Sequence, residues 1–127
     1  MRLLLDTHAL IWSFAKSERL SAVALETMTR PSTRLFASAA SVYEIEYKRA
    51  RGAEAFTGMP ADLLRAGARF GLRWLDISAE HARAAAHLDQ SHKDPWDRLI
   101  AAQAIVGSMT VVTRDAAIAR LGADVVW

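Results

Sequence analysis

Cysteine is absent from this sequence of 127 residues. Its absence excludes disulfide bonds, zinc sites built on thiolates and cysteine nucleophiles, and it fits a reducing compartment. No apolar run approaches the roughly 20 residues that cross a bilayer. The first residues also lack the long apolar core of a signal peptide. We therefore expect a cytoplasmic protein without a membrane segment.

An excess of charge of one sign is also missing. The 16 Lys and Arg residues nearly balance the 14 Asp and Glu residues, which leaves a formal net charge of +2. So small a surplus does not identify a nucleic-acid partner, although a local basic patch can form on a nearly neutral protein. The hydrophobic fraction of 52% and the charged fraction of 24% are those of a globular protein and exclude a disordered chain.

Glycine and proline are few, at 6 and 3 residues, and they are scattered as single turn signals. The sequence has no internal repeat, low-complexity segment or linker. A chain of this length suits one hydrophobic core, so we expect a single domain over residues 1–127.

Short apolar runs alternate with helical patterns along the whole chain. We expect strands at residues 2–5, 34–37, 72–77, 109–113 and 124–127. Helical patterns follow the first strand and occupy residues 21–29, 38–51, 61–70, 78–88, 95–106 and 116–121. This alternation predicts an α/β fold, a three-layer α/β/α sandwich with a mainly parallel central sheet.

Serine, proline and glycine residues mark the expected helix ends. Ser21 is a good N-cap, and Pro60 is predicted to open the helix that follows it. Gly52, Gly71 and Gly107 are each predicted to end a helix, because glycine adopts the left-handed conformation common at helix C-termini.

Acidic residues fall where the predicted strands end. Asp6 directly follows the first strand, and Asp115 follows the fourth strand in TVVTRD. Glu44 lies about two turns into the helix after the second strand. Asp94 and Asp97 open the helix that leads into the fourth strand. Since ligands of open α/β sheets bind beyond the carboxyl ends of the strands, these residues are candidates for one site.

The stretch HKDPWDRLIAAQA also has a purely structural interpretation. Asp94 before Pro95 is a strong helix start, with Asp as N-cap and Pro in the first helical position. Asp97 then occupies the third helical position, where a carboxylate favours the positive end of the helix dipole.

The other acidic residues can be explained by capping in the same way. The run from Ser41 to Glu44 matches the S-x-x-E capping box. Asp6 and Asp115 can each cap the helix that follows. Taken one at a time, capping is the better explanation; taken together, the residues favour a shared site.

Carboxylates that converge without basic partners repel one another, and a divalent cation removes that repulsion. Carboxylate oxygens suit Mg²⁺ or Mn²⁺ rather than zinc. One such ion can activate water to attack phosphorus, and two ions about 3.5–4 Å apart can hold both oxygens of the reacting phosphodiester. The pattern therefore predicts a metal-dependent phosphodiester hydrolase.

Four segments together resemble the PIN-domain family, specifically the VapC-like toxins of bacterial toxin–antitoxin pairs. They are LLLDTHALIW, SAASVYEIEYK, HKDPWDRLIAAQA and VVTRDAAI, and with them the resemblance covers nearly the whole chain. It implies an α/β/α sandwich and metal-dependent cleavage of single-stranded regions of RNA such as tRNA, rRNA or mRNA. Each motif is short; their common order on the expected elements makes the resemblance specific.

The resemblance implies catalytic, metal-binding roles for Asp6, Glu44, Asp97 and Asp115. It makes His8, His92, Asp94 and Arg98 recurrent features whose roles are less clear. We expect Asp94 to cap the helix and orient the loop that carries His92, with a contact behind the metal as the alternative. Thr7 and Thr113 are candidates for hydroxyl contacts near the ions, or for helix caps.

An acidic site needs nearby positive charge to hold RNA. We predict that Lys48, Arg98 and Arg114 bind the substrate, with Arg51 close by. Lys48 can alternatively pair with Glu44 one helical turn away.

The resemblance also implies a homodimer and a small antitoxin that fills a groove and blocks the acidic site. Aromatic residues offer surfaces for such partners if they are exposed: Trp12, Phe14, Tyr43, Tyr47 and Phe56. Trp74, Trp96 and Trp127 are instead expected in or near the core.

Two other functions compete with the ribonuclease. One is a non-catalytic module that binds RNA or protein through the same fold. The other is a phosphoryl-transfer enzyme in which Asp6 forms an aspartyl intermediate; a haloacid-dehalogenase-like site would place a second Asp at position 8, where the chain has His8. The glycine patterns of nucleotide-binding enzymes are missing as well.

Overall fold

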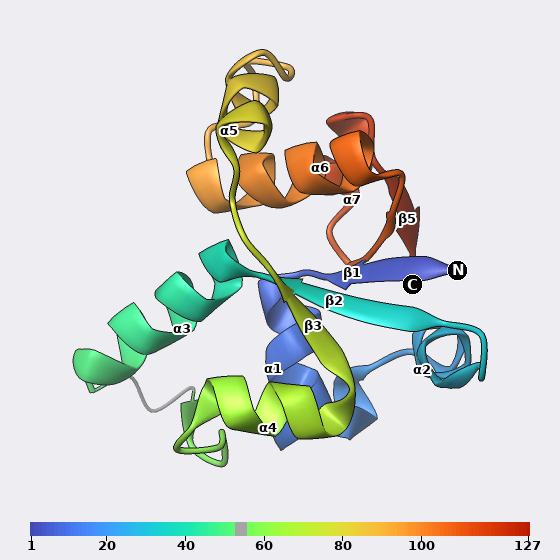
Figure 1. Cartoon of the computed structure of the whole chain (residues 1–127), viewed down its shortest axis with the longest axis vertical. Helices are drawn as coiled ribbons and strands as arrows, with labels where there is room; N and C mark the ends of the chain where they lie inside the picture. The colour runs from blue at the N-terminus through green and yellow to red at the C-terminus, as the bar shows by residue number, and fades with distance from the viewer. Residues whose placement is uncertain (53–55) are drawn as a thin grey trace.

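A five-stranded parallel sheet forms the centre of the computed structural model, which describes residues 1–52 and 56–127. The strand order is β3-β2-β1-β4-β5, and each neighbouring pair is parallel (Figure 1). The strands are β1 Arg2–Leu5, β2 Arg34–Ser38, β3 Leu72–Leu75, β4 Thr110–Val112 and β5 Asp124–Val126. The central strand β1 therefore pairs with β2 on one side and β4 on the other.

Helices cover both faces of the sheet. Those of the first half of the chain are α1 Thr7–Ala15, the 3-10 helix η1 Ser17–Arg19, α2 Ala22–Thr29, α3 Ala39–Ala50 and α4 Leu63–Phe70. The second half adds α5 Ala79–Ala86, α6 Pro95–Gly107 and α7 Ala116–Arg120. In Figure 1, α1, α2 and α4 lie below the sheet, whereas α5, α6 and α7 lie above it. The predicted α/β/α sandwich is confirmed.

Alternate residues of β1 explain these layers. Leu3 and Leu5 are fully buried in the core between the sheet and the first-half helices. Leu4 points to the opposite core, where it packs with Ile100 of α6 and Ile118 of α7. A parallel strand covered on both faces is apolar at every position, which is why RLLL predicted a buried strand.

Two predicted helix ends are wrong. Gly107 is the last residue of α6, and Ser108 takes the left-handed conformation instead, with φ 51°. The fourth helix begins at Leu63 with Asp62 as its N-cap, so Pro60 does not open it. Gly52 and Gly71 have φ of 75° and 94° and end their helices as predicted.

The predicted capping box is also wrong. Helix α3 begins three residues earlier, because the Ser38 hydroxyl accepts a hydrogen bond from the Ala40 amide. Ser41 lies inside the helix and is fully buried. Helix capping together with Ser41 therefore does not explain why the chain has a carboxylate at Glu44.

The tryptophans expected in or near the core are half-buried. Trp127 packs on Trp12 with ring centroids 5.7 Å apart. Trp74 lies over Gly67 of α4 and donates a hydrogen bond to the Leu64 carbonyl at 3.0 Å. Among the described helices, none is both long and apolar enough to cross a membrane.

Candidate functional site

Strands β1 and β4 bring Asp6 and Asp115, two of the predicted site residues, to one edge of the sheet. Asp6 follows β1, and its amide donates to the Val112 carbonyl of β4 at 3.1 Å. Thr113 and Asp115 follow β4, and the Asp115 amide donates to the Thr113 hydroxyl at 2.9 Å. Two neighbouring parallel strands end together, so their following residues meet although they are more than a hundred positions apart.

Both aspartates cap the helix that follows them, as predicted. Asp6 accepts a hydrogen bond from the Ala9 amide at 2.7 Å, and Asp115 accepts one from the Ala117 amide at 2.8 Å. A carboxylate has lone pairs for several partners, so capping does not exclude a second role for either residue. Capping instead holds each carboxylate in a defined orientation at the edge of the sheet.

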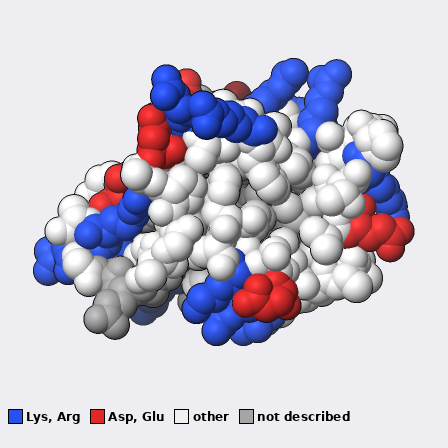
Figure 2. Space-filling model, turned by 90° about the horizontal axis from the view of Figure 1, so that it is seen from below, with Lys and Arg blue, Asp and Glu red and all other residues white. Residues whose placement is uncertain are grey.

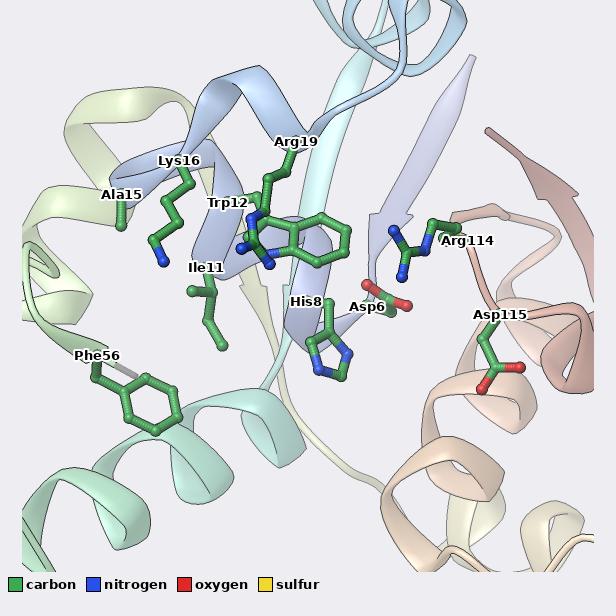
Figure 3. Close-up of a pocket in the computed structure, with 10 residues that line it drawn as sticks. All are labelled: Asp6, His8, Ile11, Trp12, Ala15, Lys16, Arg19, Phe56, Arg114 and Asp115. Atoms are coloured by element: carbon green, nitrogen blue, oxygen red, sulfur yellow. The ribbon is translucent and has the colours of Figure 1, made fainter. Parts of the chain in front are cut away.

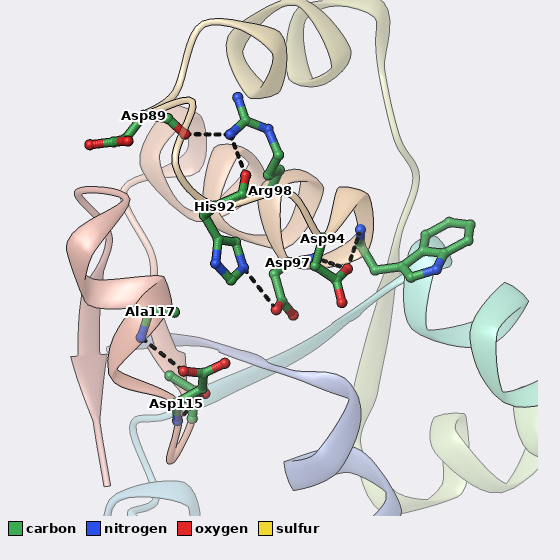
Figure 4. Close-up of polar contacts among 9 residues, drawn as sticks. Asp89, His92, Asp94, Asp97, Arg98, Asp115 and Ala117 are labelled. Atoms are coloured by element: carbon green, nitrogen blue, oxygen red, sulfur yellow. Dashed lines mark hydrogen bonds and ion pairs between the residues drawn. The ribbon is translucent and has the colours of Figure 1, made fainter.

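The start of α6 supplies the third aspartate (Figure 4). Asp94 is the N-cap, and its carboxylate accepts from the amides of Trp96 at 2.9 Å and Asp97 at 3.2 Å. Asp97 lies one turn in, on the side of α6 that faces Asp115. Its Oδ2 lies 3.1 Å from Nε2 of His92, close enough for the imidazole to donate a hydrogen bond. The cap predicted for Asp94 is confirmed, and the metal-binding role predicted for Asp97 stays a prediction.

The three aspartates influence one another. Burial is the main cause that raises the pKa of Asp6, which is 6% exposed; the repulsion of Asp97 adds to it, while hydrogen bonds from Thr113 and Ala9 act in the opposite direction. Burial likewise raises the pKa of Asp97, with repulsion from Asp94 and Asp115 added and the His92 contact opposing it. Asp97 thus lies within electrostatic reach of both strand-end carboxylates.

The donor set suits a hard divalent cation. Asp6, Asp97 and Asp115 present carboxylate oxygens, and burial, with a smaller contribution from neighbouring carboxylates, raises the pKa values of Asp6 and Asp97. Within residues 1–52 and 56–127, however, no three acidic or histidine side chains converge tightly enough to form a ready metal cluster. The residues fit Mg²⁺ or Mn²⁺ chemically, and binding requires side-chain rotation.

Glu44 is oriented away from this cluster. Its carboxylate forms an ion pair with Lys48 at 2.8 Å, one turn along α3. It lines a different pocket from Asp6 and Asp115. The alternative that Lys48 pairs with Glu44 is confirmed.

A groove of about 650 Å³ extends from Asp6 and Asp115 along α1 (Figure 3). Arg114 lies over the Trp12 ring at 5.4 Å, and Arg19 lies over the same ring at 6.0 Å. Lys16 also lines the groove. Of the basic residues predicted to bind substrate, Arg114 is the one that reaches it.

Four further residues of this groove were missed by the sequence analysis: Ile11, Ala15, Lys16 and Arg19. Trp12 and Phe56, which also line it, were named only as aromatic residues for a partner surface if they were exposed. Trp12 is mostly buried, so it is not the exposed partner surface that its aromatic character suggested. Arg19 reaches the groove because η1 turns the chain back after α1, a feature without a signal in the sequence pattern. On the face shown in Figure 2, Lys and Arg side chains lie mainly around the margin of an uncharged centre.

Arg98 does not contact this groove, which corrects its predicted role. Its terminal nitrogens donate to backbone carbonyls in the last turn of α5 and in the loop that joins α5 to α6, including Ala85 at 2.7 Å, His92 at 2.8 Å and Leu88 at 3.0 Å. Further bonds reach Asp89 and Ala86. Arg98 thus holds the loop that carries His92, a structural role.

Thr7 also differs from expectation. Its hydroxyl lies 2.9 Å from that of Ser41 in a buried contact between α1 and α3, where it neither caps a helix nor faces the aspartates. Thr113 does lie at the site, because its hydroxyl accepts a hydrogen bond from the Asp115 amide at 2.9 Å and acts to lower the pKa of Asp6. His8 is exposed, lines the groove and contacts Trp12 with ring centroids 5.6 Å apart.

Comparisons with known proteins agree with this fold. The family model described as PIN domain matches residues 3–124. A comparison with curated proteins finds no match.

Among solved structures, the chain is similar to one in the VapBC complex of Salmonella typhimurium bound to DNA, with a TM-score of 0.70, 19% identity and coverage of 99% of this chain and 97% of that one. It is also similar to one in VapBC2 of Rickettsia felis bound to a promoter DNA fragment, with a TM-score of 0.69, 17% identity and coverage of 99% and 98%. A third similar chain belongs to a toxin–antitoxin complex of Klebsiella pneumoniae, with a TM-score of 0.63, 20% identity and coverage of 90% of this chain and 87% of that one. At such identities the likeness establishes the fold alone.

Proposed function

This chain belongs to the PIN domain family, and on that premise we propose that it is a metal-dependent endoribonuclease toxin that cleaves single-stranded regions of RNA. The observation that carries the proposal is the cluster of Asp6, Asp97 and Asp115 at the carboxyl edge of the sheet, with pKa values of Asp6 and Asp97 raised by burial and by neighbouring carboxylates. Such a cluster is electrostatically costly in the free protein, and a divalent cation relieves that cost.

Asp6, Asp97 and Asp115 are the proposed ligands of Mg²⁺ or Mn²⁺, with Glu44 joining them once Lys48 releases it. When bound, the ion supplies positive charge to the phosphate and activates water for attack on phosphorus. Hydrolysis breaks the bond between phosphorus and the leaving ribose oxygen, which takes up a proton. The chain contributes oriented carboxylates and needs no serine, cysteine or histidine nucleophile.

Neighbouring residues hold these ligands in position. His92 can donate to Oδ2 of Asp97, which leaves the other oxygen of that carboxylate free to turn toward the strand ends. The Thr113 hydroxyl holds the Asp115 amide, and the Asp94 cap fixes the first turn of α6. Because these contacts already restrict the carboxylates, the side chains lose less conformational entropy when an ion binds.

The RNA backbone is proposed to follow the groove along α1. Arg114, Arg19 and Lys16 line this groove beside Asp6 and Asp115, where they can offset the repulsion between acidic side chains and phosphate. Arg114 and Arg19 both rest on the Trp12 ring, which restricts their motion.

We further propose a homodimer in the cytoplasm that is inhibited by a cognate antitoxin. The solved structures that the fold resembles are toxin–antitoxin complexes, which supports an antitoxin as the partner. The same groove along α1 is the expected place for inhibition, because a basic antitoxin side chain there would neutralise the aspartates and exclude RNA.

A matched pair of variants tests the proposal. Asp97→Asn removes the proposed ligand while keeping the side-chain volume, and it should abolish cleavage in a folded protein. Asp94→Asn remains a competent cap and should retain most of the activity. Cleavage is read by sequencing RNA ends after induced expression, and in vitro with and without EDTA. Wild-type cleavage by Asp97→Asn, or cleavage that persists in EDTA, would overturn the assignment.

A non-catalytic RNA-binding or protein-interaction module is the second candidate. The Glu44–Lys48 ion pair favours it, together with the lack of a ready metal cluster among the described residues. This alternative expects binding of RNA or protein that is insensitive to metal, and no RNA product in any buffer.

A further inference from the structure

A second groove lies on the other side of the start of α6, along α3. It has a volume of about 500 Å³ and is lined by Tyr43, Glu44, Tyr47, Lys48, Arg51 and Trp96. Trp96 directly precedes Asp97 in the chain, and Glu44 is the fourth proposed ligand. The aromatic groove, as we call this set, therefore adjoins the proposed reaction centre and shares Glu44 with it.

The rings of the aromatic groove form a continuous row. Tyr43 and Tyr47 are one helical turn apart on α3 and stack with centroids 5.8 Å apart and an angle of 21° between their planes. Trp96 of α6 contacts Tyr43 at 5.1 Å. Arg51, a further turn along α3, lies 5.4 Å above the Tyr47 ring and donates to its hydroxyl at 3.3 Å. The row thus runs from the first turn of α6 to a guanidinium at the end of α3.

These tyrosines are too exposed to serve the core. Tyr43 is 55% exposed and Tyr47 is 50% exposed, while Ile45 between them is fully buried. The face of α3 that holds the fold together is therefore a different one. Large rings arranged in a row on the surface, with two cations beside them, are typical of sites that stack bases and attract phosphates.

We propose that the aromatic groove is a base-stacking subsite for single-stranded RNA, an inference that rests on the proposed ribonuclease function. One or more bases stack on Tyr43, Tyr47 and Trp96, and Lys48 and Arg51 face the phosphates. Entry of a phosphate competes for Lys48, which frees Glu44 to turn toward the aspartates. Stacking is tolerant of base identity, because every base has a π face, so the subsite selects unpaired RNA rather than a particular sequence.

The chemistry of the groove favours RNA over a second copy of the chain. Lys48 and Arg51 outnumber Glu44, so the groove has a positive balance that complements phosphate. Arg51 already stacks on a tyrosine ring, the arrangement in which an arginine can contact a phosphate while its plane stays fixed. Two copies of this groove placed face to face would both carry that positive balance, which phosphate neutralises and a second copy does not.

The test compares Tyr43→Leu and Tyr47→Leu with Tyr43→Phe and with Leu64→Ala. Leucine keeps an apolar side chain but cannot stack, phenylalanine keeps the ring, and Leu64 is an exposed apolar residue of α4 outside the groove. Binding of a fluorescent single-stranded uridine oligonucleotide is measured in EDTA, so that neither metal nor turnover contributes. An abasic ribose–phosphate chain of the same length is the second probe.

Each leucine variant should bind the uridine probe about 5- to 150-fold more weakly than the wild type, the loss expected for one stacked base. Tyr43→Phe and Leu64→Ala should bind it like the wild type. The abasic probe should bind weakly to all five proteins. In cleavage assays the leucine variants should raise KM with little change in kcat.

Several results would overturn the subsite. One is unchanged uridine affinity in both leucine variants while the wild type binds and cleaves RNA; the ribonuclease function then stands and the subsite falls. Another is a change from dimer to monomer in the leucine variants by light scattering, which assigns the groove to a protein interface. A wild type that neither binds nor cleaves RNA removes the proposed function itself, and the subsite with it.

Discussion

Replacing Arg98 by Gln is expected to destabilise the protein without removing an RNA contact. Arg98 donates to five backbone carbonyls in the last turn of α5 and in the loop that joins α5 to α6. Three of them belong to Ala85, Ala86 and Leu88, at or just past the C-terminus of α5, where helix carbonyls lack partners within the helix. Glutamine is shorter and uncharged, and it cannot supply the forked set of donors.

The magnitude follows from these bonds. A hydrogen bond to a charged group contributes about 1.5–3 kcal/mol when it is well shielded. Here the bonds are partly exposed, share two nitrogens and restrain one segment, so their contributions are not additive. We expect a net loss of about 2–4 kcal/mol. For a chain of this length that corresponds to a fall in Tm of roughly 8–16 °C.

Thermal unfolding followed by circular dichroism measures the change, and Arg114→Gln is the matched control. Arg114 is exposed and stacks on Trp12 in the groove of Asp6 and Asp115. Its variant should keep the Tm within about 2 °C, because a single exposed contact contributes little, yet it should bind single-stranded RNA more weakly. An Arg98→Gln protein with wild-type Tm and weakened RNA binding would refute the structural role and restore Arg98 to the substrate site.

The remaining predictions concern the site and its supports. Burial raises the pKa of Asp6, so the stabilising contribution of this residue is full below its ordinary pKa of 3.8 and is lost as pH rises through the raised value. At neutral pH in EDTA, Asp6→Asn should therefore have a higher Tm than the wild type. An equal or lower Tm would contradict this. Asp94→Ala should lose about 1 kcal/mol in urea unfolding and Asp94→Asn much less, since only the latter keeps the cap; equal losses would show that the cap is not what Asp94 contributes. Gly67→Ala should lose about 1–3 kcal/mol although alanine favours helices, because its Cβ would overlap the Trp74 ring; a more stable variant would place that ring elsewhere.

Local chemistry explains the elements that the sequence predicts well. The caps of Asp6, Asp94 and Asp115 are hydrogen bonds to amides two or three residues along the chain. The apolar run of β1 reflects a strand that is buried on both faces. Such signals depend on near neighbours, so they can be read without knowing the fold. They also placed the aspartates at the strand ends, where parallel topology makes them meet.

Local signals also misled where a distant contact competed with them. The motif from Ser41 to Glu44 predicts a capping box, but the Ser41 hydroxyl bonds to Thr7 instead, 34 positions earlier. Gly107 has the residue type expected at a helix end, yet Ser108 takes the left-handed position. In both cases the residue types are compatible with more than one backbone or hydrogen-bond geometry, and the sequence does not choose between them.

What the sequence determined alone is therefore the order of elements, the caps at Asp6, Asp94 and Asp115 and the identity of the acidic residues, because periodicity and short-range hydrogen bonds encode these. What only the tertiary structure decided is which side chains share a surface. Arg98 reaches carbonyls up to 13 positions away, and Trp96 meets Tyr43 across two helices. Those contacts depend on how the helices pack around the sheet, and no spacing within a single segment specifies that packing.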